Sequence, residues 1–264
     1  MAITIKTPEE IQKMRVAGRL AAEVLEMIAP YVKEGVTTEE LNDICHDYIT
    51  KQQDAIPAPL NYGGFPKSIC TSVNEVVCHG IPDPKQKLKS GDIINIDITV
   101  IKDGYHGDTS KMFIIGEASP EDKRLCRIAQ ESLYLAMKKV KPGARLGDIG
   151  TTIQKFIKKS GRYSIVKDYC GHGIGAKFHE DPQIVHYKNG DRTVLKEGMC
   201  FTIEPMINAG RFQTILDAED NWTVYTVDGK NSAQWEHTLL VTKNGVEVLT
   251  LRAEESIPRL MVNP

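Results

Sequence analysis

Residues 88–112 read LKSGDIINIDITVIKDGYHGDTSKM, and this stretch decides the fold. Between Ile94 and Val100 apolar and polar residues alternate, which is typical of a strand with one buried face. Asp103-Gly104 follows, and this dipeptide favours a two-residue turn between antiparallel strands. The stretch therefore predicts a β-hairpin.

The predicted hairpin brings two carboxylates together. With Asp103-Gly104 as the turn, Thr99 faces Asp108, and Asp97 becomes a diagonal neighbour of Asp108 at roughly 7–8 Å. Two like charges so placed repel each other, and burial would raise their pKa values. A divalent metal ion between them would remove both problems. A carboxylate in a strand is as often simply solvated, so the hairpin alone does not decide between a metal site and a solvated face.

The same pattern recurs in the second half of the chain. A Leu-Lys-x-Gly sequence at 88–91 returns at 195–198, and six residues after each glycine stands an acidic residue. A second acidic residue opens a later predicted strand in each half. The four residues are Asp97 and Asp108 in the first half and Glu204 and Glu236 in the second. Because spacing and chemistry agree at both points, the repeat favours the metal site.

The helix signals repeat as well. Residues 7–10 (TPEE) and 119–122 (SPED) each place a Ser or Thr N-cap before proline and acidic residues, as at a helix start. A second helix is predicted in each half, at about 37–48 and about 147–159. Each half is thus helix, helix, then strands, which indicates an internal duplication with halves of about 1–117 and 118–264. No long linker separates the halves, so we expect one fused catalytic domain over 1–264.

Composition excludes several classes of protein. Of the 264 residues 41% are hydrophobic and 26% charged, as in ordinary globular proteins, and a net charge of −2 argues against a nucleic-acid or anionic membrane partner. The start of the sequence has no apolar signal segment, and no apolar run is long enough for a membrane span. The six cysteines contain no C-x-x-C pair, so they predict reduced thiols in a cytoplasmic protein. No heptad pattern is present, and we expect a monomer.

Three of the seven histidines lie in glycine-rich loops, where side chains often carry function. These are His79, His172 and His179. The others are interpreted as structural: His46 on a helix surface, His106 beside the hairpin turn, and His186 and His237. Four carboxylates bring a charge of −4, which two divalent cations balance, and a neutral imidazole adds a ligand without charge. Oxygen ligands with one imidazole suit Mn, Fe, Co or Zn, and paired metals of this kind occur in aminopeptidases.

Five motifs together make the chain resemble the bacterial type I methionine aminopeptidases along nearly its whole length. They are Asn95-Ile96-Asp97, His106-Gly107-Asp108-Thr109-Ser110, Cys170-Gly171-His172-Gly173-Ile174-Gly175, Thr202-Ile203-Glu204-Pro205-Met206 and Gln234-Trp235-Glu236-His237-Thr238. The resemblance implies an α+β pita-bread fold, with two pseudo-symmetric halves, curved antiparallel sheet inside and helices outside. It also implies removal of the initiator methionine from nascent proteins when the second residue is small.

The resemblance further implies a role for particular residues. Two divalent metal ions would be held by Asp97, Asp108, His172, Glu204 and Glu236. His79, His179 and Glu204 would be catalytic, with Glu204 as general base. The substrate methionine would be bound by Tyr62, Phe65, Cys70, His79, Phe178, His179 and Trp222. Backbone carbonyls of Asn74, Val76 and Ser232 would bind one Na⁺ or K⁺ ion. The chain departs from many bacterial relatives at two pocket positions, where it has Pro59 for cysteine and Phe65 for tyrosine.

Three alternatives stand beside this interpretation. An X-Pro aminopeptidase or prolidase of the same fold would have an extra N-terminal domain, and a type II methionine aminopeptidase a helical insertion in its second half. A non-catalytic binding protein of this fold would have lost metal ligands, whereas all five are present here. The sequence thus favours a type I enzyme acting on nascent chains near the ribosome exit.

Overall fold

The hairpin predicted from residues 88–112 is present in the computed structural model, which describes residues 3–257 and 260–262. Strand β4 (Ile93–Lys102) pairs antiparallel with β5 (Tyr105–Ile114), and Thr99 faces Asp108 as expected. Asp103 and Gly104 both have positive φ, of 49° and 79°, which a primed two-residue turn requires.

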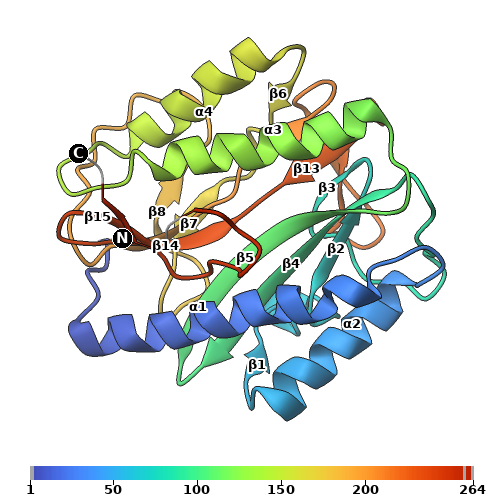
Figure 1. Cartoon of the computed structure of the whole chain (residues 1–264), viewed down its shortest axis with the longest axis horizontal. Coiled ribbons are helices and arrows are strands. Elements are labelled where there is room, and N and C mark those ends of the chain that lie inside the picture. Colours follow the sequence, from blue (N-terminus) through green and yellow to red (C-terminus); the bar gives the residue numbers. More distant parts are fainter. Residues whose placement is uncertain (1–2, 258–259, 263–264) are drawn as a thin grey trace.

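The first half of the chain builds its sheet around this hairpin. β1 (Ile56–Pro57) and β2 (Cys70–Val73) pair with β4 along the edge opposite β5, and β3 (Val76–Cys78) lies close to β2. Helices α1 (Pro8–Ile28) and α2 (Thr38–Asp47) each begin with a capping box, and both cover the outer face (Figure 1). A Cβ on Gly107 would lie 2.3 Å from the carbonyl carbon of Ala17, so only glycine lets α1 pack this closely on β5.

The second half repeats the plan of helices over antiparallel sheet. Its helices are α3 (Pro120–Met137), capped by Ser119, and α4 (Gly147–Ser160). A six-stranded sheet runs in the order β16 (Leu260–Val262), β15 (Gly245–Val248), β14 (His237–Val241), β9 (Cys200–Ile203), β7 (Gly171–Gly173), β8 (Glu180–Ile184). In Figure 1 α3 and α4 lie over this half as α1 and α2 lie over the first.

Short elements complete the structure. One three-stranded sheet contains β13 (Ser232–Gln234), β10 (Met206–Asn208) and β6 (Ser164–Ile165), and another joins β11 (Thr214–Leu216) and β12 (Val224–Thr226) to β3. The helical turns are Ala29–Tyr31, Tyr48–Gln52 and Tyr62–Gly64. In the part of the chain described, no helix is long and apolar enough to cross a bilayer.

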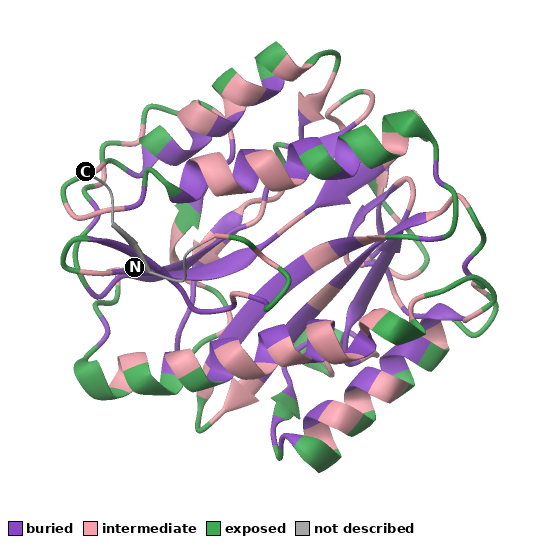
Figure 2. Cartoon of the chain, viewed as in Figure 1, coloured by how far each residue is buried: buried purple, intermediate pink, exposed green. Residues whose placement is uncertain are grey.

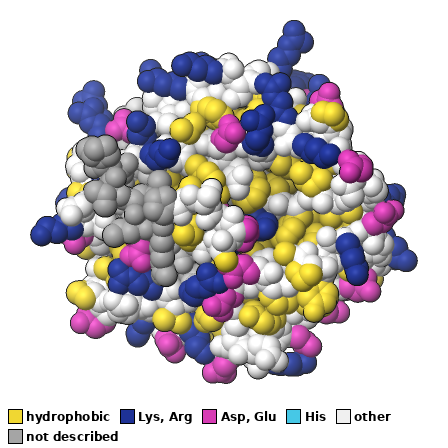
Figure 3. Space-filling model, in the orientation of Figure 1, with side chains coloured by type: hydrophobic (Ala, Val, Ile, Leu, Met, Phe, Trp, Pro, Cys, Tyr) yellow, Lys and Arg dark blue, Asp and Glu magenta, His cyan; other side chains and the backbone are white. Residues whose placement is uncertain are grey.

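The two largest apolar cores lie between helices and sheet, one mainly in each half. The larger core packs α3 and α4 residues such as Leu133 and Ile153 against Phe201 and Leu239 of the second sheet. The other packs α1 and α2 on the inward face of β4, so that the buried purple faces of helices and strands meet in Figure 2. On the surface, apolar side chains also gather between the two helix pairs, and charges of both signs lie around them (Figure 3). Because both cores lie under the helices, the opposite, polar faces of the central strands are free to build a site.

Candidate metal centre and substrate pocket

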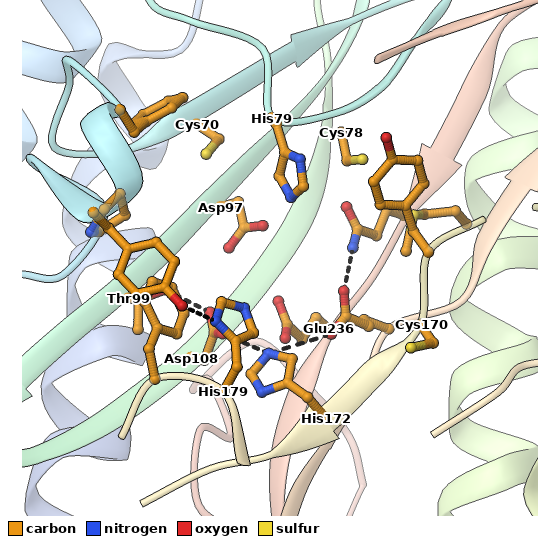
Figure 4. A pocket seen from close by; sticks show the side chains of 18 of the residues that line it. Cys70, Cys78, His79, Asp97, Thr99, Asp108, Cys170, His172, His179 and Glu236 are labelled. Atoms are coloured by element: carbon orange, nitrogen blue, oxygen red, sulfur yellow. Dashed lines mark hydrogen bonds and ion pairs between the residues drawn. The ribbon is translucent and has the colours of Figure 1, made fainter. Parts of the chain in front are cut away.

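The five predicted ligands line one cavity of about 450 Å³. The hairpin register puts Asp97 of β4 and Asp108 of β5 on the same face, two residues apart across the strands. In the second half His237 pairs with Ile203, which places Glu204, after β9, beside Glu236, before β14. Figure 4 shows Asp97, Asp108, His172 and Glu236 pointing into a common space. The structure thus brings all five together from both halves of the chain.

The ligand atoms are close enough to share a cation. One ligand atom each of Asp108, His172 and Glu236 lies within 4.8 Å of the others. The Nε2 of His172 is 3.5 Å from Oδ2 of Asp108 and 3.7 Å from Oε1 of Glu204. The Nδ1 of His172 is 2.9 Å from the Gly173 carbonyl, so it carries the proton and leaves the Nε2 lone pair directed at the carboxylates.

Asp97, Glu204 and Glu236 are costly to ionise in the protein alone. Burial raises the pKa of Asp97 and of Glu236 well above their usual values, and repulsion from Asp108 adds to both. Burial also raises the pKa of Glu204 to about 7, although the neighbouring His172 opposes the rise. No Lys or Arg in the described part of the chain forms an ion pair with any of the four. Four converging carboxylates and one imidazole therefore fit divalent metal ions by chemistry and by charge.

Further residues, which sequence reasoning missed, orient the ligands. Thr99 Oγ1 donates to Oδ1 of Asp108 over 2.8 Å. Thr202 Oγ1 donates to Oε1 of Glu204 over 2.8 Å, and Gln234 Nε2 donates to Oε2 of the same residue over 3.1 Å. The hairpin register that places Thr99 opposite Asp108 was the one sequence signal for any of these contacts.

His172, expected in a loop, lies in strand β7, whereas His79 and His179 lie in loops as expected. These two line the cavity without joining the ligand cluster. His79 points into the cavity from the side opposite His172 (Figure 4). Burial lowers the pKa of His79, and partial burial together with His172 lowers the pKa of His179 to about 4. Both imidazoles are therefore neutral at neutral pH. The hydroxyl of Tyr62 is 2.8 Å from Nδ1 of His179 and fixes its ring.

The four histidines interpreted as structural lie outside the ligand cluster. His186 and His237 are buried, and His186 Nε2 accepts the backbone N–H of Glu204 over 3.1 Å. His106 is buried as well and stacks on Phe178, with ring centroids 5.5 Å apart. His46, expected on a helix surface, lies in α2 and is half-buried, with its Nδ1 2.7 Å from Ser68 Oγ.

The predicted methionine pocket forms one wall of the same cavity. All seven predicted substrate-binding residues line it: Tyr62, Phe65, Cys70, His79, Phe178, His179 and Trp222. Phe65 meets Trp222 edge to face at 5.3 Å, and Tyr62 lies 4.9 Å from Phe178. Cys78, Tyr169, Cys170 and Met206 also line the cavity and were not predicted. The wall is thus aromatic and rich in sulfur.

The three residues predicted to bind a monovalent cation lie at the junction of β3 and β13. The Asn74 carbonyl accepts the Ser232 N–H over 2.9 Å, so these two residues are adjacent. Val76 opens β3 two residues further along the chain. Cation binding by the three residues stays a prediction.

Comparison with known proteins places the chain in a family. Residues 12–243 match metallopeptidase family M24. The methionine aminopeptidase of Escherichia coli (strain K12) is 62% identical over 262 residues, which cover 99% of this chain and 98% of that protein. The crystal structure of methionine aminopeptidase from Rickettsia prowazekii superposes with a TM-score of 0.92 at 55% identity, covering 95% of this chain and 100% of that one.

Longer peptidases share this fold. Prolidase from Pyrococcus furiosus superposes with a TM-score of 0.73 at 25% identity, covering 95% of this chain but 66% of that one. These structures confirm the pita-bread fold expected from the sequence. Given the extent and identity of the matches, the chain belongs to the methionine aminopeptidases of metallopeptidase family M24.

Proposed function

We propose that this chain removes the initiator methionine from nascent proteins whose second residue is small. The observation that carries the proposal is the single cavity in which four carboxylates and an imidazole meet an aromatic, sulfur-rich wall. A peptidase needs both parts, because one part activates water and the other selects the residue to be cleaved.

Asp97, Asp108, His172, Glu204 and Glu236 would hold two divalent metal ions, drawn from Co, Mn, Fe and Zn. When bound, such ions polarise the scissile carbonyl and lower the pKa of water towards about 7. The −4 charge of the carboxylates supports two ions rather than one. Thr99, Thr202 and Gln234 would keep the carboxylate oxygens in place as the ions bind.

Glu204 is placed to move a proton. Its two oxygens accept hydrogen bonds from Thr202 and Gln234, and its side chain lines the cavity beside the other proposed ligands. A carboxylate within hydrogen-bond reach of the attacking water can serve as its general base. We infer that Glu204 accepts a proton from the attacking water and passes it to the leaving amine.

His79 and His179 would bind the reacting amide. Tyr62 can donate its hydroxyl proton to Nδ1 of His179, which leaves the Nε2 proton directed away from Tyr62. Because both imidazoles are neutral, they can donate hydrogen bonds to the substrate carbonyl and to the oxyanion that develops from it. Neither histidine is required for charge balance at the metals.

The methionine side chain would lie against Tyr62, Phe65, Cys70, Phe178 and Trp222. An unbranched thioether packs well on aromatic rings and on sulfur. Pro59 lines the same cavity, so the two departures noted in the sequence, Pro59 and Phe65, both lie at the pocket.

We further propose that the whole chain, 1–264, is one catalytic domain that arose by duplication of halves of about 1–117 and 118–264. Hydrogen bonds between β5 and the segment before β14 support this, since they join the halves at the ligands themselves. The enzyme would work as a monomer in the cytoplasm, near the ribosome exit, where its substrates appear. Asn74, Val76 and Ser232 would bind one Na⁺ or K⁺ ion.

A peptide panel tests the specificity. Peptides beginning Met-Ala, Met-Gly, Met-Lys, Ala-Ala and Ala-Pro are incubated with the enzyme, with and without a chelator. Cleavage of Met-Ala and Met-Gly, little cleavage of Met-Lys, and loss of activity with chelator are expected. The likeness to prolidase makes the X-Pro activity the second candidate, and faster cleavage of Ala-Pro than of Met-Ala would favour it.

A further inference from the structure

Two threonine hydroxyls join the ligand-bearing strands of the two halves behind the cavity. Thr238 Oγ1 donates to the Asp108 carbonyl over 2.7 Å and accepts the Asp108 N–H over 3.1 Å. Thr109 Oγ1 donates to the Glu236 carbonyl over 2.7 Å. Both threonines are fully buried and neither lines the cavity. In each half, a threonine side chain thus hydrogen-bonds to the backbone of a predicted ligand from the other half.

The Thr109 hydroxyl is directed by a buried arginine. Nη1 of Arg252 donates to Thr109 Oγ1 over 2.8 Å, and the side chain of Arg252 is 0% exposed. A guanidinium can only donate hydrogen bonds, whereas a hydroxyl has one proton to give. Because Arg252 donates to a lone pair of the Thr109 oxygen, the hydroxyl proton of Thr109 is left to be donated to the Glu236 carbonyl.

Arg252 is itself held by groups adjacent to the ligands. Its Nη2 lies 3.0 Å from Oε1 of Glu255, and its guanidinium lies over the ring of Trp235, 5.7 Å from the centroid. The same oxygen of Glu255 lies 3.0 Å from Nε2 of His237. Trp235 and His237 flank Glu236 in the chain, so the segment at 250–255 holds the Glu236 backbone on both sides.

The ligands need such support because their side chains repel each other. Asp108 and Glu236 come from different halves, and their carboxylates must stay close before any cation is bound. We propose that Arg252 is a positioning residue: by directing the Thr109 hydroxyl to the Glu236 carbonyl, it sets the spacing of Asp108 and Glu236 and so the affinity for divalent metal. The inference rests on the ligand assignment proposed above.

Two substitutions test this without changing a ligand. Thr109→Val keeps the size of the side chain but removes the hydroxyl. Arg252→Lys keeps the charge but loses the planar guanidinium, which donates to Thr109 and to Glu255 at the same time. Thr109→Ser, which keeps the hydroxyl, is the conservative partner. The matched control is Thr226→Val, since Thr226 is 4% exposed, donates to the Lys230 carbonyl over 2.8 Å, and does not line the cavity.

Co²⁺ is titrated into the metal-free full-length variants, with binding followed by calorimetry and by visible absorption, and urea unfolding is measured on the same samples. Thr109→Val and Arg252→Lys are expected to bind Co²⁺ about 10–100-fold more weakly than the unsubstituted protein, as for other partners of metal ligands. Thr109→Ser should bind close to normally. Thr226→Val should lose stability but bind Co²⁺ normally.

Normal Co²⁺ affinity in Thr109→Val and Arg252→Lys, with reduced stability alone, would overturn the proposal. If Thr109→Val does not fold, the Co²⁺ affinity of Arg252→Lys tests the proposal. The ligand variants Asp97→Asn and His172→Ala show whether the positioning role of Arg252 or the assignment of the metal ligands has failed. If they bind Co²⁺ normally, the ligands are wrong; if they lose it while Thr109→Val and Arg252→Lys do not, only the positioning role is wrong.

Discussion

The ion pair between Lys6 and Glu180 is predicted to stabilise the loop that carries Phe178 and His179. The Nζ of Lys6 lies 2.6 Å from Oε2 of Glu180, and the two side chains are 2% and 11% exposed. Substituting Lys6→Met keeps an unbranched apolar stem but leaves an enclosed carboxylate without its cation. Breaking a buried pair by removing one partner costs about 3–5 kcal/mol, so Lys6→Met should lose that much free energy of unfolding at neutral pH.

The loss should depend on pH in a defined direction. Burial alone would raise the pKa of Glu180, but the hydrogen bond from Lys6 holds it below its usual value of 4.5. A depressed folded-state pKa gives stability that is present above the unfolded-state pKa and is lost as the pH falls through the folded-state value. Without Lys6 the pKa of Glu180 should rise, since only the hydrogen bonds from Lys177 and Thr4 then oppose the effect of burial. The difference between the two proteins should therefore be full at neutral pH and shrink as the pH falls through the raised pKa of Glu180 in the variant towards its lower pKa in the unsubstituted protein.

Urea unfolding of both proteins at neutral pH and at about pH 4 measures this difference. Lys51→Met is the control, because the pair between Lys51 and Asp47 has a similar length, 2.8 Å, but side chains 66% and 57% exposed. An exposed pair of this spacing is worth about 0.3–0.5 kcal/mol. Equal losses in Lys6→Met and Lys51→Met, or a Lys6→Met loss that does not shrink at acid pH, would refute the reasoning.

Three further predictions concern the proposed site. His79→Ala and His179→Ala should keep their metal and lose about 10²–10³ in kcat, whereas His172→Ala should lose metal; elemental analysis beside steady-state kinetics checks this, and the reverse pattern would mean that ligand and catalytic histidines are interchanged. Asp97→Asn should lose metal rather than merely slow the reaction, and normal metal content with normal turnover would contradict its assignment. Phe65→Ala should raise KM for Met-Ala peptides more than it lowers kcat, because the ring contacts the methionine equally in ground and transition states; a pure kcat effect would exclude it from the pocket.

Local patterns were enough to predict several features of the site. Alternation along β4 and the Asp103-Gly104 turn set the hairpin register, and with it the place of Asp97 beside Asp108. These patterns succeed because strand periodicity and turn chemistry act over a few residues. The internal repeat extended the prediction to Glu204 and Glu236, since the same local rules apply in both copies.

Contacts between distant segments were not predicted. Arg252 reaches Thr109 across 143 residues, and Lys6 reaches Glu180 across 174. No spacing rule links such pairs, because their distance depends on how the two halves pack. His46 shows the same limit, since its hydrogen bond with Ser68 was not predicted either.

The sequence by itself thus predicted the groups proposed for the chemistry, which are four carboxylates and three histidines, together with the strands that carry the carboxylates. Only the tertiary structure decided how these groups are held, through the contacts of Thr99, Thr202 and Gln234 at the ligands and of Thr109 and Arg252 behind them. The physical reason is that a ligand type follows from residue identity and local periodicity. Orientation instead depends on buried hydrogen bonds, which form only once the two halves have packed together.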